Sequence, residues 1–278
     1  MQHPFTAVSA VGLDLDAIID LCRAYEPLLR PGEAFSHTTA ARLYGAPLPP
    51  RSVAAPPVHV TAPPGTSRAR TRGVIGHEAI RPVHRATRYG LPLVAPATMW
   101  VQCAALVDRR DLAAIGDFLL TGVRHGDAAE PPLARIGELQ EVVRSLRGAR
   151  GMASVRWALE RIRPGADSRP ETLARLLLVG AGLPEPVIGP EVVVSGGRIL
   201  HPDLGYPEHA VALEYEGGRH LDPARWKRDI ERRELFEDAG WRVIRVTSDD
   251  LFDRPEALVR RVRSAVLASS SRRAVDPG

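Results

Sequence analysis

The stretch that decides the fold is Val211–Arg233, which reads VALEYEGGRHLDPARWKRDIERR. An apolar segment carries Glu214 and Glu216 into a glycine pair, and a charged helical segment follows. Side chains alternate along a strand, so the two glutamates share one face and lie roughly 7 Å apart. Two acids on an otherwise hydrophobic strand cost free energy unless a cation meets them. The pattern therefore favours a metal site beside this strand.

The length and composition are those of a globular protein. The chain has 278 residues, enough for one large domain or two ordinary ones, with 44% hydrophobic and 25% charged residues. No apolar run approaches the ~20 residues of a membrane span, and the segment MQHPFTAVSA lacks a signal pattern. We expect a cytoplasmic protein with no membrane association. Cys22 and Cys103 match no metal-binding spacing and are expected to be buried thiols.

The charge balance is mildly basic. The net charge is +4, the pI is about 9.5, and Lys227 is the only lysine, so arginine supplies nearly all of the positive charge. Arginine suits phosphate oxygens because its planar fork donates paired hydrogen bonds. A GC-rich genome also enriches arginine, together with alanine, glycine and proline. The charge is compatible with DNA binding without demonstrating it.

The first part of the chain, residues 1–165, is predicted to be a mixed α/β domain in which helices dominate. Within it, Val58–Thr61 alternates like a strand, and Arg68, Arg70 and Arg72 recur with period two after a proline–glycine turn. This predicts a hairpin with an arginine-rich face, which is either a solvated edge strand or a DNA-contacting wing. The break Arg163–Asp167 ends the helical pattern, so we place the domain boundary there.

The second domain, residues 166–268, is predicted to have the order α-β-β-β-α-β-α, followed by a flexible tail of residues 269–278. A capping box with an early proline, SRPE, begins the first helix at Ser168. The glycine pair Gly196-Gly197 predicts a hairpin between strands at residues 191–195 and 198–204. The remaining elements are a strand at 211–215, a helix at 222–240, a strand at 241–247 and a helix at 253–268.

Four carboxylates, all candidate catalytic residues, occupy informative places in this order. Glu171 lies in the first turn of the first helix, Asp203 lies near the end of the second strand, and Glu214 and Glu216 share a face of the third. If these two strands pair, Asp203 approaches Glu214 on one face. Carboxylate oxygens are the ligands of Mg²⁺, which can activate a water molecule and stabilise charge on a phosphoryl group. Helix capping for Glu171 and a turn role for Asp203 are the structural alternatives.

The segments HPDLGYPEHAVALEYEGGRH and WKRDIERRELFEDAGWRVIRV resemble the very-short-patch-repair (Vsr)-like endonuclease domain of the PD-(D/E)XK superfamily. The resemblance covers about Ser168 to Val266. It implies a restriction-endonuclease-like αβββαβ core and Mg²⁺-dependent (or Mn²⁺-dependent) cleavage of DNA phosphodiesters in repair or defence. The superfamily's usual proline before the first acid is present as Pro202.

The same resemblance assigns roles to individual residues. Asp203 would be the central metal ligand, Glu214 the second and Glu171 the third. His220 would be a general acid or base, or a histidine that satisfies a turn. Glu216 occupies the place of the superfamily's usual lysine, where Vsr-like proteins commonly have an acid.

The charged helix after the turn would supply DNA contacts. Its Arg228 and Arg232 are the candidates, with the arginine-rich hairpin of the first domain as a second surface. Arg232 and Asp229, three residues apart on one helix face, could instead pair with each other as scaffold.

The first domain is similar to the body of AbiEi-type antitoxin proteins, through SHTTAARLYGAPLP, VHVTAPPG and LPLVAPATMWVQCAALVDRRDLAAIGDFLL. This likeness supports a second hypothesis, a non-catalytic DNA-binding or antitoxin-like regulator that retains a nuclease fold. DNA is the expected partner under both hypotheses. A second copy of the chain, or the partner protein of a toxin system, is a further candidate.

Overall fold

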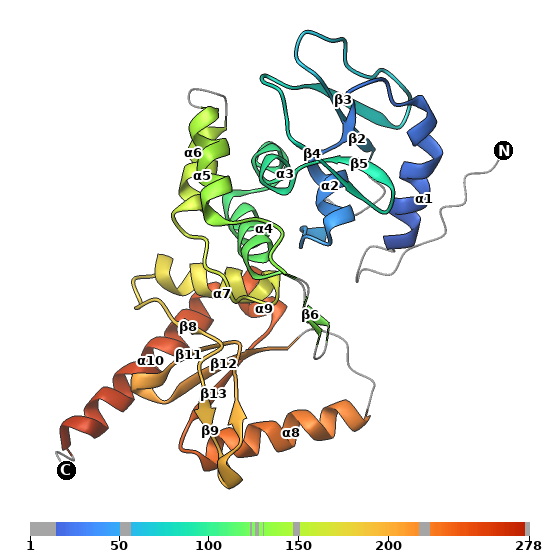
Figure 1. The fold of residues 1–278 in the computed structure, drawn as a ribbon. Helices are drawn as coiled ribbons and strands as arrows, with labels where there is room; N and C mark the ends of the chain where they lie inside the picture. Colours follow the sequence, from blue (N-terminus) through green and yellow to red (C-terminus); the bar gives the residue numbers. More distant parts are fainter. Residues whose placement is uncertain are drawn as a thin grey trace. The chain divides into compact units, whose positions relative to one another are not determined.

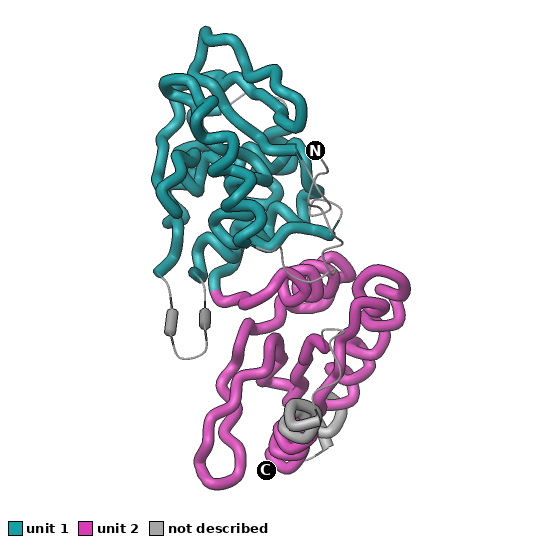
Figure 2. Tube along the Cα trace, turned by 90° about the vertical axis from the view of Figure 1, so that its right-hand side faces the viewer, with its two compact units in different colours: residues 1–164 teal, residues 165–278 magenta. Residues whose placement is uncertain are grey.

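The computed structural model describes residues 15–50, 57–122, 124–125, 128–129, 131–146, 151–216 and 223–275. The chain divides into two compact units, Met1–Pro164 (unit 1) and Gly165–Gly278 (unit 2), which Figure 2 shows in different colours. The division falls beside the break at which the helical pattern of the sequence ends. Both units combine helices with sheets, so the fold is of the mixed α/β class.

Unit 1 is built around a mixed sheet. Its strands are β1 (Ala34–Phe35), β2 (Val58–Ala62), β3 (Val74–Glu78), β4 (Arg85–Arg88) and β5 (Leu91–Val94). In the described part of the unit these five strands have the order β3-β2-β1-β5-β4. β2 is parallel to β3 and antiparallel to β1, which is parallel to β5. A separate pair joins β6 (Arg124–His125) to β7 (Ala128–Ala129).

Helices pack around this sheet and against one another. They are α1 (Leu15–Tyr25), α2 (His37–Tyr44), α3 (Pro96–Cys103), α4 (Arg109–Thr121), α5 (Ile136–Ser145) and α6 (Met152–Leu159). α2 is buried along its whole length, and the Tyr44 hydroxyl donates to the Val94 carbonyl of β5 at 2.9 Å. The buried Trp100 indole of α3 donates to the Leu112 carbonyl of α4 at 2.8 Å. Both of these buried polar side chains therefore have a hydrogen-bond partner, as a packed interior requires.

The arginine-rich hairpin predicted for unit 1 is wrong. β2 and β3 are parallel, and residues 63–73 form the crossover between them rather than a strand. This crossover lies directly against β3, since a Cβ added to Gly76 would stand 2.3 Å from the Ala69 carbonyl oxygen. Arg68, Arg70 and Arg72 are exposed on the crossover. Their period-two spacing therefore reflects an extended loop and not a paired strand.

Unit 2 contains the stretch Val211–Arg233. Its main sheet has the strands β8 (Val187–Ile188), β11 (Leu204–Tyr206), β12 (Val211–Tyr215) and β13 (Arg242–Val246). Among the described residues the order is β13-β12-β11-β8, with β12 and β13 parallel and the other pairs antiparallel. The helices are α7 (Arg169–Gly180), α8 (Pro223–Asp238), α9 (Ser248–Phe252) and α10 (Pro255–Val275).

Helices cover both faces of the unit 2 sheet (Figure 1). Alternation along β13 sends Ile244 and Val246 to a core shared with α7 and α10, which includes the buried Leu178 and Val262. Val243 faces the other way, toward a smaller cluster around Phe236 of α8. The sheet is therefore a central layer between α7 and α10 on one side and α8 on the other.

Several details of unit 2 differ from the sequence prediction. The predicted strand at 198–204 is not continuous, and Asp203 precedes β11 instead of ending a strand. The strands around Gly196-Gly197 do form a hairpin, β9 (Val192–Val193) with β10 (Ile199–Leu200), but it is a separate pair outside the main sheet. In the main sheet the strand that pairs with β11 on this side is β8. Its two residues are too few for an alternation of apolar and polar side chains to be recognised in the sequence. The tail predicted from residue 269 is helical as far as Val275, because α10 continues through it.

The contact between the crossover and β3 gives a stability prediction. Gly76→Ala places a methyl group on the Ala69 backbone, which cannot move without displacing the crossover, so we expect a loss of about 1–3 kcal/mol in the free energy of unfolding. Gly137→Ala in α5, where a Cβ meets nothing within 4 Å, is the matched control and should be neutral or stabilising by about 0.5–1 kcal/mol. Urea unfolding of both variants tests this, and equal stabilities would contradict it.

Candidate active site

The pairing of β11 with β12 brings two of the predicted site residues together. Leu204 lies opposite Leu213 in this antiparallel pair, so Asp203, one residue before β11, lies level with Glu214. The Asp203 carboxylate also accepts a hydrogen bond of 2.7 Å from the Tyr215 backbone N–H. Because the donor is backbone of β12, the orientation of this carboxylate is fixed by the sheet itself.

Glu171 approaches the same place from α7. Its carboxylate is 8% exposed and accepts hydrogen bonds from the Ser168 hydroxyl (2.7 Å) and the Asp167 backbone N–H (2.9 Å). The capping role considered from the sequence is therefore present. Burial and the negative charge of Asp203 nevertheless raise the pKa of Glu171 to about 7, against the lowering effect of these hydrogen bonds. Capping and proximity to Asp203 coexist in this residue.

Asp203 is held in a similar balance. Burial raises the pKa of its carboxyl, and so does Asp167, while the Tyr215 N–H and the positive charge of Arg232 act in the opposite direction. Two neighbouring carboxyl groups with raised pKa values bind a proton more readily than isolated ones. They also gain the most from a cation, since a cation offsets both their burial and their mutual repulsion.

Arginines neutralise the two glutamates of the deciding stretch. Arg232 of α8 contacts the Glu214 carboxylate at 2.9 Å and donates to the His201 carbonyl at 2.5 Å. Its guanidinium also lies 5.1 Å from the Phe236 ring centroid. Glu216 pairs with Arg245 of β13. Arg232 thus acts as scaffold for Glu214 in this state. Glu214, in β12, and Glu216, directly after β12, have different partners.

Some predicted residues lie elsewhere or cannot be placed. His220 falls outside the described residues, as do the side chains of Arg228 and Asp229, whose backbone is in α8. Arg68, Arg70 and Arg72 lie in unit 1 and are described with that unit alone.

The carboxylates fit Mg²⁺ only in part. Within the described residues, the one group of three or more histidine, cysteine or acidic side chains whose ligand atoms lie within 4.8 Å of one another consists of histidines. Asp203, Glu214 and Glu171 do not form such a group. Mg²⁺ needs only one or two carboxylates because it keeps several waters, and Asp203 with Glu171 supplies these. Glu214 could add a further carboxylate oxygen only if its contact with Arg232 opened.

Sequence reasoning missed several contributors. Asp167 adds negative charge beside Glu171, and Arg245 neutralises Glu216. The histidine group, His37, His59 and His77 of unit 1, was also missed. Its members are separated by 21 and 17 residues and match no short motif. The available signal was a histidine in the middle of the apolar strand VHVT, where a polar ring needs a partner.

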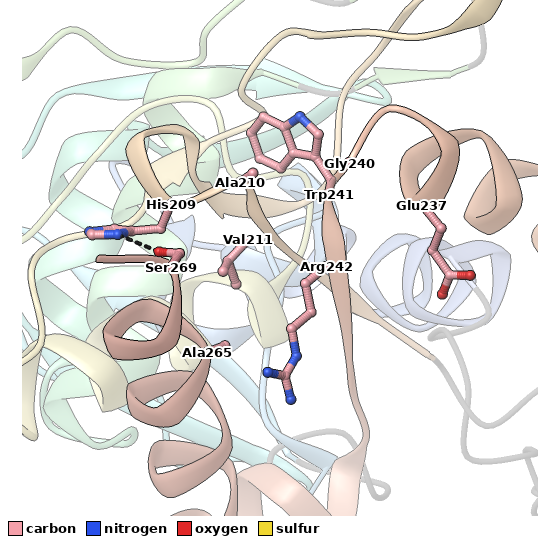
Figure 3. Close-up of a pocket in the computed structure, with 9 residues that line it drawn as sticks. All are labelled: His209, Ala210, Val211, Glu237, Gly240, Trp241, Arg242, Ala265 and Ser269. Atoms are coloured by element: carbon pink, nitrogen blue, oxygen red, sulfur yellow. Dashed lines mark hydrogen bonds between the residues drawn. The ribbon is translucent and has the colours of Figure 1, made fainter. Parts of the chain in front are cut away.

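A cleft of about 440 Å³ lies at the opposite end of β12 and β13 from the acids. It is lined by the first residues of both strands, Val211 and Arg242, and by Trp241. Figure 3 shows the His209 ring directed toward the Ser269 hydroxyl, with 2.8 Å between Nδ1 and Oγ. Asp203 and Glu214 lie beside the last residue of β12 instead. The cleft is therefore a feature separate from the carboxylates.

Two mycobacterial proteins match this chain over 72% of its length. The protein is 30% identical over 201 residues to two proteins of Mycobacterium tuberculosis, the uncharacterized protein MT2308 (strain CDC 1551 / Oshkosh) and the uncharacterized protein Rv2248 (strain ATCC 25618 / H37Rv). Each match covers 72% of this chain and 70% of the relative. The chain therefore belongs to the same family as these mycobacterial proteins. No protein-family model and no solved structure matches it.

One further property bears on partners. Among the described residues, no helix is both long enough and apolar enough to cross a membrane.

The raised pKa of Glu171 gives a pH-dependent stability prediction. The carboxyl titrates at its ordinary value in the unfolded chain and near 7 in the folded unit, so the folded state binds more protons between these values. The contribution of Glu171 to stability is therefore present at low pH and is lost as the pH rises toward and through 7. Glu171→Gln cannot ionise, and we expect it to exceed the wild type in stability at pH 8 by roughly 1–3 kcal/mol.

Thermal or urea unfolding in EDTA across pH 5–8 measures this difference, because EDTA removes any divalent ion that would mask it. Glu208→Gln, at an exposed position in the same unit, is the control. A Glu171→Gln variant whose stability relative to the wild type does not change with pH would contradict the prediction.

Proposed function

We propose that this protein is a Mg²⁺-dependent endonuclease that hydrolyses DNA phosphodiesters, with its active site at the Asp203 end of β11 and β12. Two observations carry the proposal: the sheet register sets Asp203 level with Glu214, and Glu171 at the capped end of α7 lies near enough to feel the charge of Asp203. The resemblance of unit 2 to Vsr-like endonucleases, and of its α7-β8-β11-β12-α8-β13 order to the restriction-endonuclease-like core, supports it.

The residues of the site divide into ligands and supports. Asp203 and Glu171 would hold the ion, with Glu214 joining them once released from Arg232. Bound Mg²⁺ would lower the pKa of a coordinated water and offset the charge that develops on the phosphoryl group. The Tyr215 N–H keeps the Asp203 carboxylate in place. Glu171 must lose its proton to act as a ligand, so the affinity of the site for Mg²⁺ should increase as the pH rises toward 7.

Arg232 links the site to the substrate in this proposal. Its guanidinium pairs with Glu214 in the present structure and is about one-third exposed. A DNA phosphate presents the same kind of anionic oxygens as a carboxylate, and arginine binds both in the same planar fashion. If Arg232 released Glu214 and bound a DNA phosphate instead, Glu214 would be free to bind the ion. Arg232 would then contact DNA, as the resemblance implies.

The nuclease proposal predicts cleavage that depends on Asp203. Purified wild-type protein should nick supercoiled plasmid in Mg²⁺ or Mn²⁺ and not in EDTA. Asp203→Asn should reduce the rate by at least about 100-fold, since loss of metal-borne charge stabilisation is worth several kcal/mol. Asp238→Asn, which alters an exposed carboxylate at the end of α8, is the matched control and should cleave like the wild type. Equal rates for Asp203→Asn and the wild type would refute the proposal.

A specific observation also favours a second candidate, the non-catalytic DNA-binding or antitoxin-like regulator. Both glutamates of β12 and its following turn are already neutralised by arginines, Glu214 by Arg232 and Glu216 by Arg245. In a unit that binds no metal, arginines would supply the positive charge beside these glutamates, as they do here. If the plasmid stays intact, DNA binding that weakens steeply with salt and does not respond to EDTA identifies this candidate, because phosphate contacts alone release counterions.

A further inference from the structure

Unit 1 contains three histidines that come from three different elements. His37 is the first residue of α2, His59 is the second residue of β2, and His77 lies on β3. The parallel register sets Thr61 opposite His77, so His59 and His77 are diagonal neighbours on one face. His37 and His59 are only 7% and 4% exposed, and His77 is half-buried. The crossover of residues 63–73 is what brings β3, and with it His77, beside β2.

The rings lie close enough to share one ion. One nitrogen from each ring falls within 4.8 Å of the other two. His59 Nδ1 and His77 Nε2 are 2.9 Å apart, and the ring centroids of His37 and His77 are 3.6 Å apart. Two nitrogens bound to one tetrahedral zinc ion, each about 2.0–2.1 Å from it, would be roughly 3.3 Å apart. A small separation of the rings would therefore accommodate the ion.

The environment keeps all three rings in the form that binds metals. Burial, together with the other two rings, lowers the pKa of His37 to about 2. Burial also lowers the pKa of His59 to about 4, with contributions from His77 and Arg42. The pKa of His77 is lowered by burial and by Arg68. Neutral imidazole carries the free lone pair that a metal needs, so at neutral pH protons do not compete for these nitrogens.

Surrounding groups hold the rings in position. His37 Nδ1 lies 3.0 Å from the Ser36 hydroxyl, which leaves Nε2 of the ring for a ligand. The His59 backbone N–H donates to the Thr39 hydroxyl at 2.8 Å, and Gln102 bridges the His37 backbone N–H to the Thr61 hydroxyl. His37 also has a φ of 51°, in the left-handed region that residues other than glycine rarely adopt. Such strained backbone occurs preferentially at functional sites.

We propose that His37, His59 and His77 bind one divalent transition-metal ion of the zinc class, with the fourth coordination position open to water or to a ligand. Imidazole nitrogens suit zinc and its transition-metal neighbours and not Mg²⁺, which prefers oxygen. The nearby cations Arg42 and Arg68 weaken the attraction of any dication. The ion bridges α2 and the edge strand β3. The site lies in unit 1 and does not depend on the proposed nuclease activity.

Direct metal uptake tests the proposal in full-length protein without a histidine tag, which would bind metal itself. After chelator treatment and removal of the chelator, we expect one zinc ion per chain by elemental analysis and competition with a chromophoric chelator. Co²⁺ should give the visible absorption of a tetrahedral nitrogen site. Excess zinc should also raise the unfolding temperature, because an ion that binds only the folded state stabilises it.

Variants assign the ligands. His77→Gln, at the half-exposed position on the edge strand, should lower zinc affinity by at least about 100-fold and abolish the cobalt spectrum. His59→Gln should do the same. His84→Gln changes an exposed histidine of unit 1 outside the cluster and should leave uptake unchanged.

The contrary outcomes are equally specific. Wild-type protein that takes up no zinc and gives no cobalt spectrum would show that the rings form a hydrogen-bonded cluster only. Zinc uptake that persists in His77→Gln would place the ion elsewhere. If the buried His59→Gln variant does not fold, the cobalt spectrum of the wild type and the result for His77→Gln still decide.

Discussion

The pairing of β11 with β12 is the constraint on which unit 2 depends. The hydrogen bonds that set Leu204 against Leu213 also bring Asp203 level with Glu214 and provide a backbone donor for the Asp203 carboxylate. A shift of one residue would turn Leu204 and Leu213 away from the core and would separate the acids. α7 and α10 pack on the sheet face that carries Leu204 and Leu213, and this packing fixes the register. The packing therefore also positions Asp203 and Glu214, which are not part of the apolar core.

Placing four carboxylates near the end of β12 costs free energy, and the protein accommodates them in two ways. Asp203 and Glu171 lie buried beside each other and hold their protons more tightly than isolated carboxyls. Glu214 and Glu216 form ion pairs with arginines from α8 and β13. Packing of the core requires neither arrangement, because apolar residues of similar volume would fill the same space at a lower cost in free energy. The proposed cation site would account for this arrangement, and the proposed release of Glu214 by Arg232 would connect the site to an anionic substrate.

Local signals in the sequence predicted much of unit 2. The Ser168 cap, the alternation of Val211–Tyr215 and the turn glycines at 196 and 197 each depend on neighbouring residues, and each has a counterpart in the structure. The missed features depend on contacts between distant residues. β8 is a strand because β11 pairs with it, and the crossover that makes β3 parallel to β2 lies close over Gly76. The three histidines meet through that same crossover, so no spacing rule could have found them. The ion pairs of Arg232 and Arg245 are likewise set by side-chain packing between elements and not by a local pattern.

A crystal structure of the protein with Mn²⁺ tests the central claim most directly, since anomalous scattering locates the ion without reference to activity. The account predicts an ion at about 2.1–2.2 Å from Asp203, with Glu171 as a second ligand and Arg232 displaced from Glu214. A structure at saturating Mn²⁺ and pH 8 in which no ion contacts Asp203, while Arg232 and Glu214 remain paired, would contradict it.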